Sequence, residues 1–189
     1  VTQPRMIQLA REWRLPDGPS VIMLPGRSSR WKGHLLLVDA LAKLGRTDVC
    51  CIMVGAEQSG HYRAEVEQRI RQRGVEGIVR IVEHCRDMPA AYMLADVVVS
   101  ASTQPEAFGR VVAEAQAMGR PVVAPDHGAA PEVILPGETG WLTPPGDPDG
   151  LAAALDIALN LNAEQRAQLA ETAIANVRAK FTRVEMCAR

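Results

Sequence analysis

The chain has 189 residues, of which 47% are apolar and 23% charged, and its formal net charge at pH 7 is −1. This length suits one full domain with a sizeable core and is short for two. The sequence has no apolar run of the roughly 18 residues that a membrane-spanning helix needs. A near-neutral chain also lacks the dense basic face that nucleic-acid binding by counterion release requires, so no nucleic-acid partner is expected.

The first residues, VTQPRMIQLAREW, have neither the basic start nor the apolar run of a signal peptide. Because the chain starts at Val1 rather than Met, we expect it to be a piece of a longer protein. The four cysteines (Cys50, Cys51, Cys85 and Cys187) lack metal-ligand spacing, and the four histidines form no HxxxH or HxH pair. We therefore expect no metal site, buried thiols at Cys50 and Cys51, and a reducing, cytoplasmic compartment.

Short apolar runs of strand length alternate with helical patterns in the first half of the chain. The expected elements are a helix over residues 3–13, a strand over Ser20–Leu24, a helix ending at Gly45, a strand over Asp48–Val54, a helix over His61–Arg73, a strand over Ile78–Val82 and a short helix that Asp87 caps and that runs through Leu94. The stretch Pro25–Gly33 is expected to be a loop.

The same alternation continues in the second half. The expected elements are a strand over Val97–Ser100, a helix from about Phe108 to Gly119, a strand over 121–124, a helical turn after the loop 126–132, a strand over 141–143, a helix that Asp147 caps, and a final helix with a capping box at Asn162 and Gln165. Near-continuous apolar strands between helices predict a parallel sheet covered on both faces. The expected fold is a Rossmann-like, doubly wound α/β domain spanning residues 1–189.

Ligands of such sheets bind at the carboxyl ends of the strands, where loops meet helix N-termini. Three polar loops fall there: 26–33, 100–109 and 126–132. Two nucleotide-binding signatures, GxGxxG after the first strand and GxxxxGK[ST], are missing from the sequence. A hydride-transfer dehydrogenase and a P-loop ATPase are therefore unlikely interpretations.

Charged residues in two of these loops suggest a different ligand. Arg27 and Lys32 lie on the first loop, and two cations beside glycines at a helix N-terminus suit a diphosphate, although a solvated basic loop has the same composition. Glu106 precedes the start of the next helix, where a carboxylate also serves as a cap. Glu114 lies on that helix, about 12 Å further along its axis by helix rise.

Glu114 stands among alanines and has two interpretations. One is an ion pair with Arg110, one turn back along the helix. The other is a bidentate acceptor for two vicinal hydroxyl groups, which a ribose supplies. The backbone amides of residues 108–110 are expected to be free at the helix start and able to bind phosphate or sugar oxygens.

Three segments together resemble the retaining glycosyltransferases of the GT-B fold, in the large family that includes sucrose synthase-like and lipopolysaccharide mannosyl- and glucosyltransferases. PEAFGRVVAEAQAMGRPVVA is similar to their glutamate-seven-glutamate motif, LPGRSSRWKG to their G-R-x-x-x-x-K-G loop, and GETGWLTPPGDPDGLAAAL to their closing segment. The resemblance covers residues 20–182. Two departures stand out: Gln104 occupies a position that is often acidic, and Ala129 replaces a second glycine after Gly128.

The resemblance implies roles for ten residues. Arg27 and Lys32 would hold the donor diphosphate and stabilise the leaving group, and Glu106 would contact hydroxyls of the transferred sugar. The implied donor-binding residues are Gly26, Gly55, Cys85, Arg86, Phe108, Gly109 and Glu114. Among them, Glu114 would bind the ribose hydroxyls, and Gly26 and Gly55 would allow close backbone approach. The loop His84–Cys85–Arg86 would lie beside the base. The resemblance implies no metal and no further cofactor.

The resemblance places this chain in the C-terminal, donor-binding half of a GT-B fold. The acceptor pocket, for a glycan or a lipid-linked acceptor, would lie in an N-terminal domain absent here, and the C-terminal helix would be truncated after Arg189. Peripheral association of the whole protein with the inner face of the cytoplasmic membrane stays an open option. Two alternatives remain: a non-catalytic nucleotide-binding module, and another GT-B enzyme such as a sugar-nucleotide epimerase or a phosphorylase.

Overall fold

A computed structural model gives the structure of the chain, and it describes residues 1–55 and 60–181. Cys187 lies outside the described residues. The strands are β1 (Ser20–Pro25), β2 (Val49–Val54), β3 (Val79–Val82), β4 (Val97–Val99), β5 (Val122–Pro125) and β6 (Gly140–Thr143). The helices are α1 (Gln3–Glu12), the single 3₁₀ turn η1 (Arg30–Lys32), α2 (His34–Leu44), α3 (Gly60–Arg73), α4 (Met88–Leu94), α5 (Arg110–Ala117), α6 (Ala130–Val133), α7 (Pro148–Leu159) and α8 (Ala163–Lys180).

The six strands form one sheet in the order β3-β2-β1-β4-β5-β6, and every neighbouring pair is parallel. Strand β1 lies between β2 and β4, with Ile22 opposite Cys51 on one side and Val97 on the other. The chain therefore winds outward from β1 in one direction and then from β4 in the other. This arrangement confirms the predicted doubly wound Rossmann-like fold, and it creates a crevice where the order reverses, beyond the carboxyl ends of β1 and β4.

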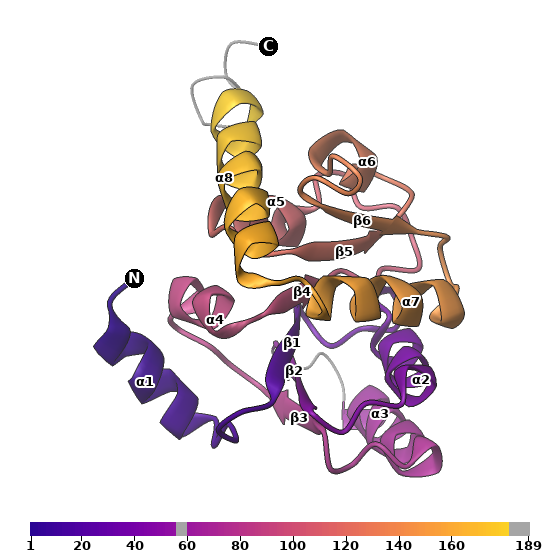
Figure 1. The fold of residues 1–189 in the computed structure, drawn as a ribbon. Coiled ribbons are helices and arrows are strands. Elements are labelled where there is room, and N and C mark those ends of the chain that lie inside the picture. Colours follow the sequence, from indigo (N-terminus) through magenta and orange to yellow (C-terminus); the bar gives the residue numbers. More distant parts are fainter. Residues whose placement is uncertain (56–59, 182–189) are drawn as a thin grey trace.

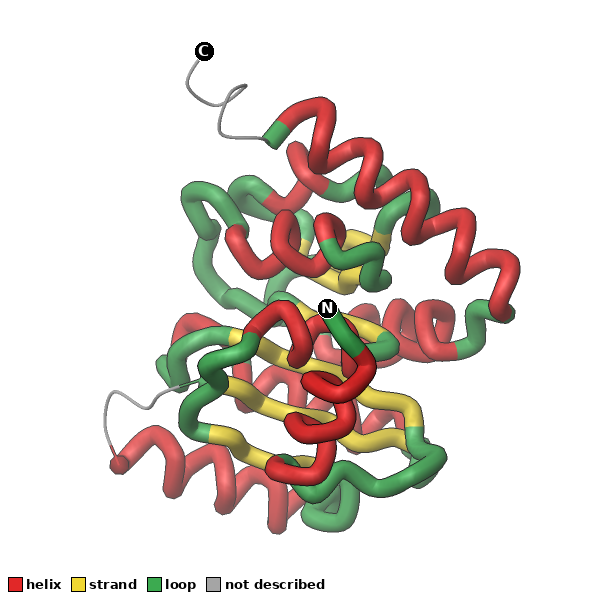
Figure 2. Tube along the Cα trace, turned by 90° about the vertical axis from the view of Figure 1, so that its left-hand side faces the viewer, coloured by secondary structure: helices red, strands yellow, loops and turns green. Residues whose placement is uncertain are grey.

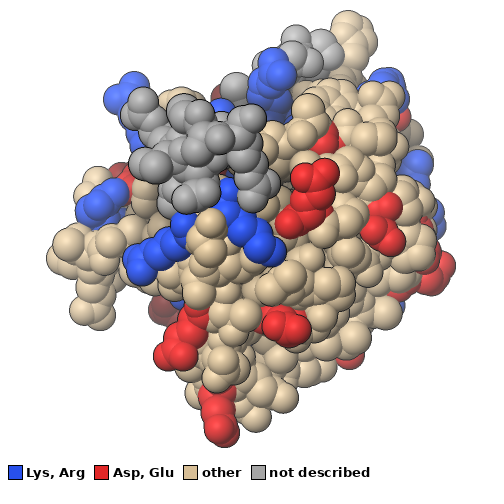
Figure 3. All heavy atoms as spheres, turned by 90° about the horizontal axis from the view of Figure 1, so that it is seen from above, with Lys and Arg blue, Asp and Glu red and all other residues tan. Residues whose placement is uncertain are grey.

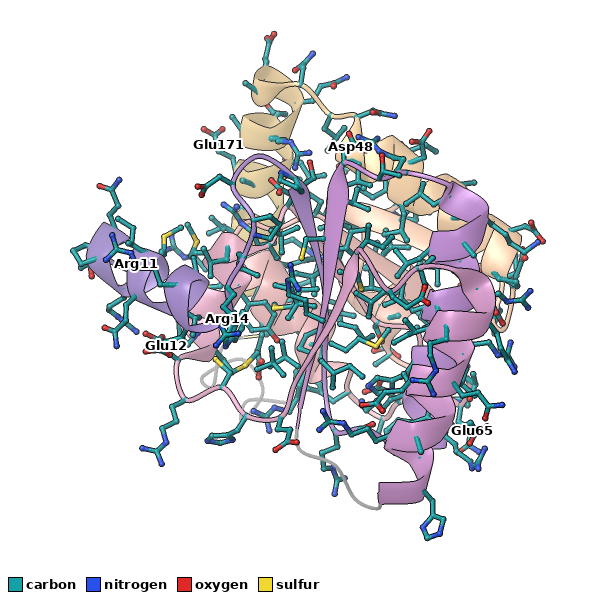
Figure 4. The ribbon with its side chains drawn as sticks, turned by 90° about the horizontal axis from the view of Figure 1, so that it is seen from below. Arg11, Glu12, Arg14, Asp48, Glu65 and Glu171 are labelled. Atoms are coloured by element: carbon teal, nitrogen blue, oxygen red, sulfur yellow. The ribbon has the colours of Figure 1, made fainter. Side chains whose placement is uncertain are left out.

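Helices cover both faces of the sheet, with α2, α3 and α7 on one side and α1, α4, α5 and α8 on the other (Figure 1). Viewed from below, Arg11 on α1 and Glu65 on α3 lie on opposite sides of the strands, with packed side chains between them (Figure 4). The neighbours Cys50 and Cys51 are both buried and belong to different core clusters, as strand alternation predicts.

Helix α1 lies across the face of the sheet that Figure 2 presents. It packs against α4, and its residue Leu9 and the C-cap residue Trp13 join the core of that face. The guanidinium of Arg5 donates hydrogen bonds of 2.8 and 2.6 Å to the two carboxylate oxygens of Asp87. The Asp87 carboxylate also accepts from the backbone amide of Ala90, which confirms Asp87 as the cap of α4.

The helix boundaries largely follow the sequence signals. Asp147 caps α7, and Asn162 and Gln165 form both hydrogen bonds of the predicted capping box at α8. Gly45 ends α2 in the left-handed conformation, with φ of 64°. Residues 30–32, expected as part of a loop, form the 3₁₀ turn η1.

The prediction was wrong about the start of α5. The helix begins at Arg110 rather than near Phe108, because Gly109 is left-handed (φ 61°, ψ 49°) and interrupts the helical path. Glu106 and Glu114 therefore do not lie on one continuous helix. A separation of about 12 Å calculated from helix rise does not apply to this pair of carboxylates.

The surface reflects the balanced charge of the chain. On the face shown in Figure 3, basic and acidic side chains both occur, and most of the visible area is uncharged. Among the helices within the described residues, none has both the length and the apolar character needed to cross a membrane.

Candidate donor-binding site

A cleft of about 440 Å³ opens at the carboxyl ends of β1 and β4, where the strand order reverses. The loop after β1, the segment before α5, and the helices α4 and α5 form its walls. The residues that line it are Pro25, Gly26, Arg27, Trp31, Lys32, Met88, Tyr92, Glu106, Phe108, Gly109, Arg110, Val111 and Glu114. Seven of the ten residues singled out in the sequence are thus brought together: Gly26, Arg27, Lys32, Glu106, Phe108, Gly109 and Glu114.

An ion pair between two loops lies in the cleft. Lys32 Nζ is 2.9 Å from Glu106 Oε1, and only 16% and 18% of the two side chains are exposed. The Lys32 ammonium also lies over the Trp31 ring, 4.3 Å from its centroid. The buried hydroxyl of Ser102 donates to the same oxygen of Glu106. The Glu106 carboxylate is therefore held in place by two donors and keeps its second oxygen outside these contacts.

Close backbone approach brings the two loops together. A Cβ atom on Gly33 would lie 1.8 Å from the carbonyl oxygen of Ala101, so only glycine fits at the start of α2. The amide of Thr103 donates a 2.7 Å hydrogen bond to the carbonyl of Trp31. Lys32 and Glu106 consequently meet because the end of η1 packs directly against the chain that leaves β4.

The loop after β5 supports Glu106 from a third direction. A Cβ atom on Gly128 would lie 2.6 Å from the backbone nitrogen of Glu106, and the amide of Ala129 donates a 3.0 Å hydrogen bond to the Glu106 carbonyl. His127 Nε2 lies 2.9 Å from the carbonyl oxygen of Ser102 and, as the donor of this hydrogen bond, carries a proton. Ala129 has φ of −82°, which any residue adopts, so its departure from the family's second glycine costs no backbone strain.

The start of α5 presents unpaired donors to the cleft. The carbonyl of Gly109 accepts from the amides of Val112 and Ala113. Within the described part of the chain, the amides of Phe108, Gly109 and Arg110 donate to no other residue. These groups carry the positive end of the α5 dipole and can bind an anion or a sugar oxygen.

Glu114 is held between a buried and an exposed partner. Its Oε2 accepts a 2.8 Å hydrogen bond from the hydroxyl of Tyr92, a residue with 2% exposure. Its Oε1 accepts from Arg110, at 3.0 Å from Nη2 and 3.3 Å from Nε. Burial, followed by the nearby Glu114 charge, raises the pKa of Tyr92, so the phenol stays protonated and remains a donor. The ion pair expected from the sequence is thus present, together with a second partner.

The remaining site residues lie in different positions. Arg27 is exposed at the cleft. Gly55 backs the loop after β1, since a Cβ atom there would lie 1.9 Å from the carbonyl oxygen of Gly26. Cys85 and Arg86 are not among the residues that line the cleft; Cys85 packs against the core beside α4, and burial raises the pKa of its thiol. The described residues contain no group of three His, Cys, Asp or Glu side chains placed to hold a metal ion.

Sequence reasoning missed three residues that contact the two glutamates or their supports. Tyr92 and Ser102 each donate to a carboxylate of the cleft, and His127 bonds the backbone of Ser102. Tyr92 is 22 positions from Glu114, and local spacing gives no sign of such a pairing. Ser102 lies four positions before Glu106, in a loop where that spacing has no defined geometry.

Comparison with known proteins identifies the family to which the chain is similar. The family described as "Glycosyl transferases group 1" matches residues 7–176. A D-inositol 3-phosphate glycosyltransferase of Jonesia denitrificans is 36% identical over 76% of this chain and 35% of its own length. A lipopolysaccharide 1,2-N-acetylglucosaminetransferase of Salmonella typhimurium is 31% identical over 92% of this chain and 48% of its own length.

A solved structure has the same fold throughout. HepE from Anabaena, in complex with UDP and glucose, superimposes with a TM-score of 0.90 and 30% identity, covering 100% of this chain and 51% of that one. The chain therefore spans about half or less of the length of these three proteins.

Proposed function

The chain belongs to the group 1 glycosyl transferases, and on that premise we propose that it is the donor-binding domain of a retaining enzyme. The full protein would transfer a hexosyl group from a nucleotide-diphosphate sugar to a glycan or lipid-linked acceptor, whose pocket lies on an N-terminal domain. The observation that carries this proposal is the cleft itself, where the Lys32–Glu106 pair, Glu114 and the unpaired amides before α5 converge. The complex of HepE with UDP and glucose supports it.

Lys32 is suited to bridge the sugar and the diphosphate of a donor. An ammonium group has three N–H donors. One is used by Glu106, so the others can reach a phosphate oxygen without breaking the ion pair. Arg27 adds a second cation, and the amides of Phe108 and Gly109 add neutral donors. These groups would stabilise the charge that develops on the departing diphosphate, and we propose that no metal is needed for it.

Glu106 is suited to bind rather than to react. Lys32 and Ser102 both contact its Oε1, which fixes the orientation of the carboxylate in the cleft. We propose that its free oxygen accepts from hydroxyls of the transferred sugar. Retention would then follow from attack on the same face as the leaving diphosphate, whose oxygen takes the proton of the acceptor. A pair of catalytic carboxylates, as in a retaining glycosidase, is not required.

The test begins with binding and continues to catalysis. Thermal-shift measurements on this chain with UDP, GDP, ADP and their hexose conjugates should show stabilisation by one nucleotide series, because a ligand of the folded state raises the unfolding temperature. Sugar transfer should be absent until the upstream domain is restored. Hydrolysis of the donor by the full-length protein would distinguish a transferase from a non-catalytic module, and no stabilisation by any of these nucleotides would contradict the proposal.

A further inference from the structure

The two partners of Glu114 differ in how easily they can move. Tyr92 belongs to the buried core between α4 and the sheet, and its hydroxyl reaches Glu114 Oε2 at 2.8 Å. Arg110 lies on the surface, with 81% of its side chain exposed. An exposed pair one helical turn apart contributes little and is screened by salt. A ligand that needs Glu114 can therefore displace Arg110 at small cost, whereas Tyr92 cannot withdraw without disturbing the core.

The number of acceptor positions on the Glu114 carboxylate limits how such a ligand can bind. Two carboxylate oxygens offer about four acceptor positions. Tyr92 uses one on Oε2, and the guanidinium of Arg110 uses both on Oε1. Two vicinal hydroxyls need at least one position on each oxygen if they bind side by side. Such a ligand must then replace Arg110 while Tyr92 keeps the carboxylate facing the cleft.

From this asymmetry we propose that Tyr92 is a positioning residue that fixes Glu114 for ribose recognition, so that the cleft selects ribonucleotides over 2′-deoxyribonucleotides. The inference rests on the proposed binding of a nucleotide donor. Without the Tyr92 hydroxyl, the carboxylate keeps only its exposed partner and follows the Arg110 side chain toward solvent. The ribose hydroxyls then lose a fixed acceptor, while the diphosphate contacts of Lys32 and Arg27 stay in place.

A ratio of affinities separates this role from a general structural one. UDP, GDP and ADP are each titrated into the chain by calorimetry beside their 2′-deoxy counterparts. The wild-type chain should prefer the ribonucleotide by about tenfold, the size of one hydrogen bond to a charged group. Tyr92→Phe should reduce this preference to about threefold or less. The misplaced carboxylate then loses its contact with the 2′-hydroxyl, a group that the 2′-deoxynucleotide lacks. A structural defect would weaken both ligands equally and leave the ratio unchanged.

The matched control is Tyr62→Phe, which removes another buried tyrosine hydroxyl. Tyr62 lies on α3, on the opposite face of the sheet, and is not among the cleft-lining residues. The Tyr62→Phe variant should keep the full preference for the ribonucleotide over its 2′-deoxy form. Glu114→Asp provides a second variant that does not alter the core: it keeps the charge but withdraws the oxygens from Tyr92, and it should also lose the preference.

The possible failures are distinct. If the wild-type chain binds none of the nucleotides, the proposed function fails, and this inference with it. If the wild-type chain binds a nucleoside diphosphate but does not distinguish its 2′-deoxy form, donor binding stands and the role of Glu114 on ribose is overturned. If the wild-type chain distinguishes them and Tyr92→Phe or Glu114→Asp does so equally well, only the positioning role of Tyr92 is overturned.

Discussion

Lys32 Nζ and Glu106 Oε1 lie 2.9 Å apart, and they join the loop after β1 to the loop after β4 across the point where the strand order reverses. Neither side chain is more than one-fifth exposed. In the proposed donor complex, the pair would place a cation for the diphosphate next to a carboxylate for the sugar. A nucleotide-sugar carries the complementary groups, an anionic phosphate and sugar hydroxyls, on the two sides of the bond between its phosphate and its sugar.

Lys32→Met should weaken binding of a nucleoside diphosphate by roughly 10- to 100-fold, because a hydrogen bond to a charged group contributes about 1.5–3 kcal/mol. Isothermal titration with the nucleotide that stabilises the chain measures the loss. Lys43→Met is the matched control: Lys43 also pairs with a carboxylate, that of Asp149, but both side chains are well exposed and outside the cleft. Equal affinities of the two variants would count against the role of Lys32.

Gly33→Ala should destabilise the fold by more than 2 kcal/mol or so, since a methyl group would collide with the carbonyl of Ala101 and push the two loops of the site apart. Gly74→Ala is the matched control. Gly74 has a similar φ, 67° against 74°, but open space around the position of its Cβ. Urea unfolding of both variants isolates the clash from backbone strain, and similar losses of stability would show that the close approach is unimportant.

His34 should make the fold sensitive to acid. It is 4% exposed, and burial, the largest cause, lowers its pKa from 6.5 to about 4. The neutral imidazole is therefore favoured in the folded state. The free energy of unfolding is highest above pH 6.5 and decreases as the pH falls toward 4, because the unfolded state binds the proton more readily. This decrease amounts to about 3 kcal/mol by linkage.

His34→Phe should flatten this pH dependence, because phenylalanine keeps an edge-to-face contact with Tyr62 and cannot be protonated. Unfolding free energies at pH 7.5 and 4.5 provide the comparison. His61→Gln, at an exposed position, is the control and should retain the wild-type slope. A wild-type slope in His34→Phe would mean that other groups cause the acid sensitivity.

The alternation of apolar strands and capped helices was sufficient to predict the sheet, its two covered faces and most helix ends. These features depend on local signals, such as Asp87, Asp147 and the pair Asn162 and Gln165, whose side chains bond to backbone amides within three residues. The start of α5 was not predicted correctly, because Gly109 adopts a left-handed conformation. The helix-forming residues that follow it give no sign of this conformation in the sequence.

The candidate site was predictable where its residues share a loop and unpredictable where they meet across the fold. Arg27 and Lys32 could be grouped from one short loop, and Glu106 and Glu114 from one motif. The contacts of Tyr92 with Glu114 and of His127 with Ser102 join segments 22 and 25 residues apart. They form because α4 and α5 line the same cleft and because the loop after β5 contacts the loop after β4. Periodicity does not encode these distances.

An NMR titration of the backbone amides of this chain with a nucleoside diphosphate, UDP first and then GDP and ADP, tests the central claim most directly. The account predicts that the largest chemical-shift changes occur in the two segments 26–33 and 106–114, which contribute most of the lining of the cleft at the carboxyl ends of β1 and β4. Changes centred instead on the groove beside β6 and α8, around Gly137, Trp141 and Thr172, would contradict it.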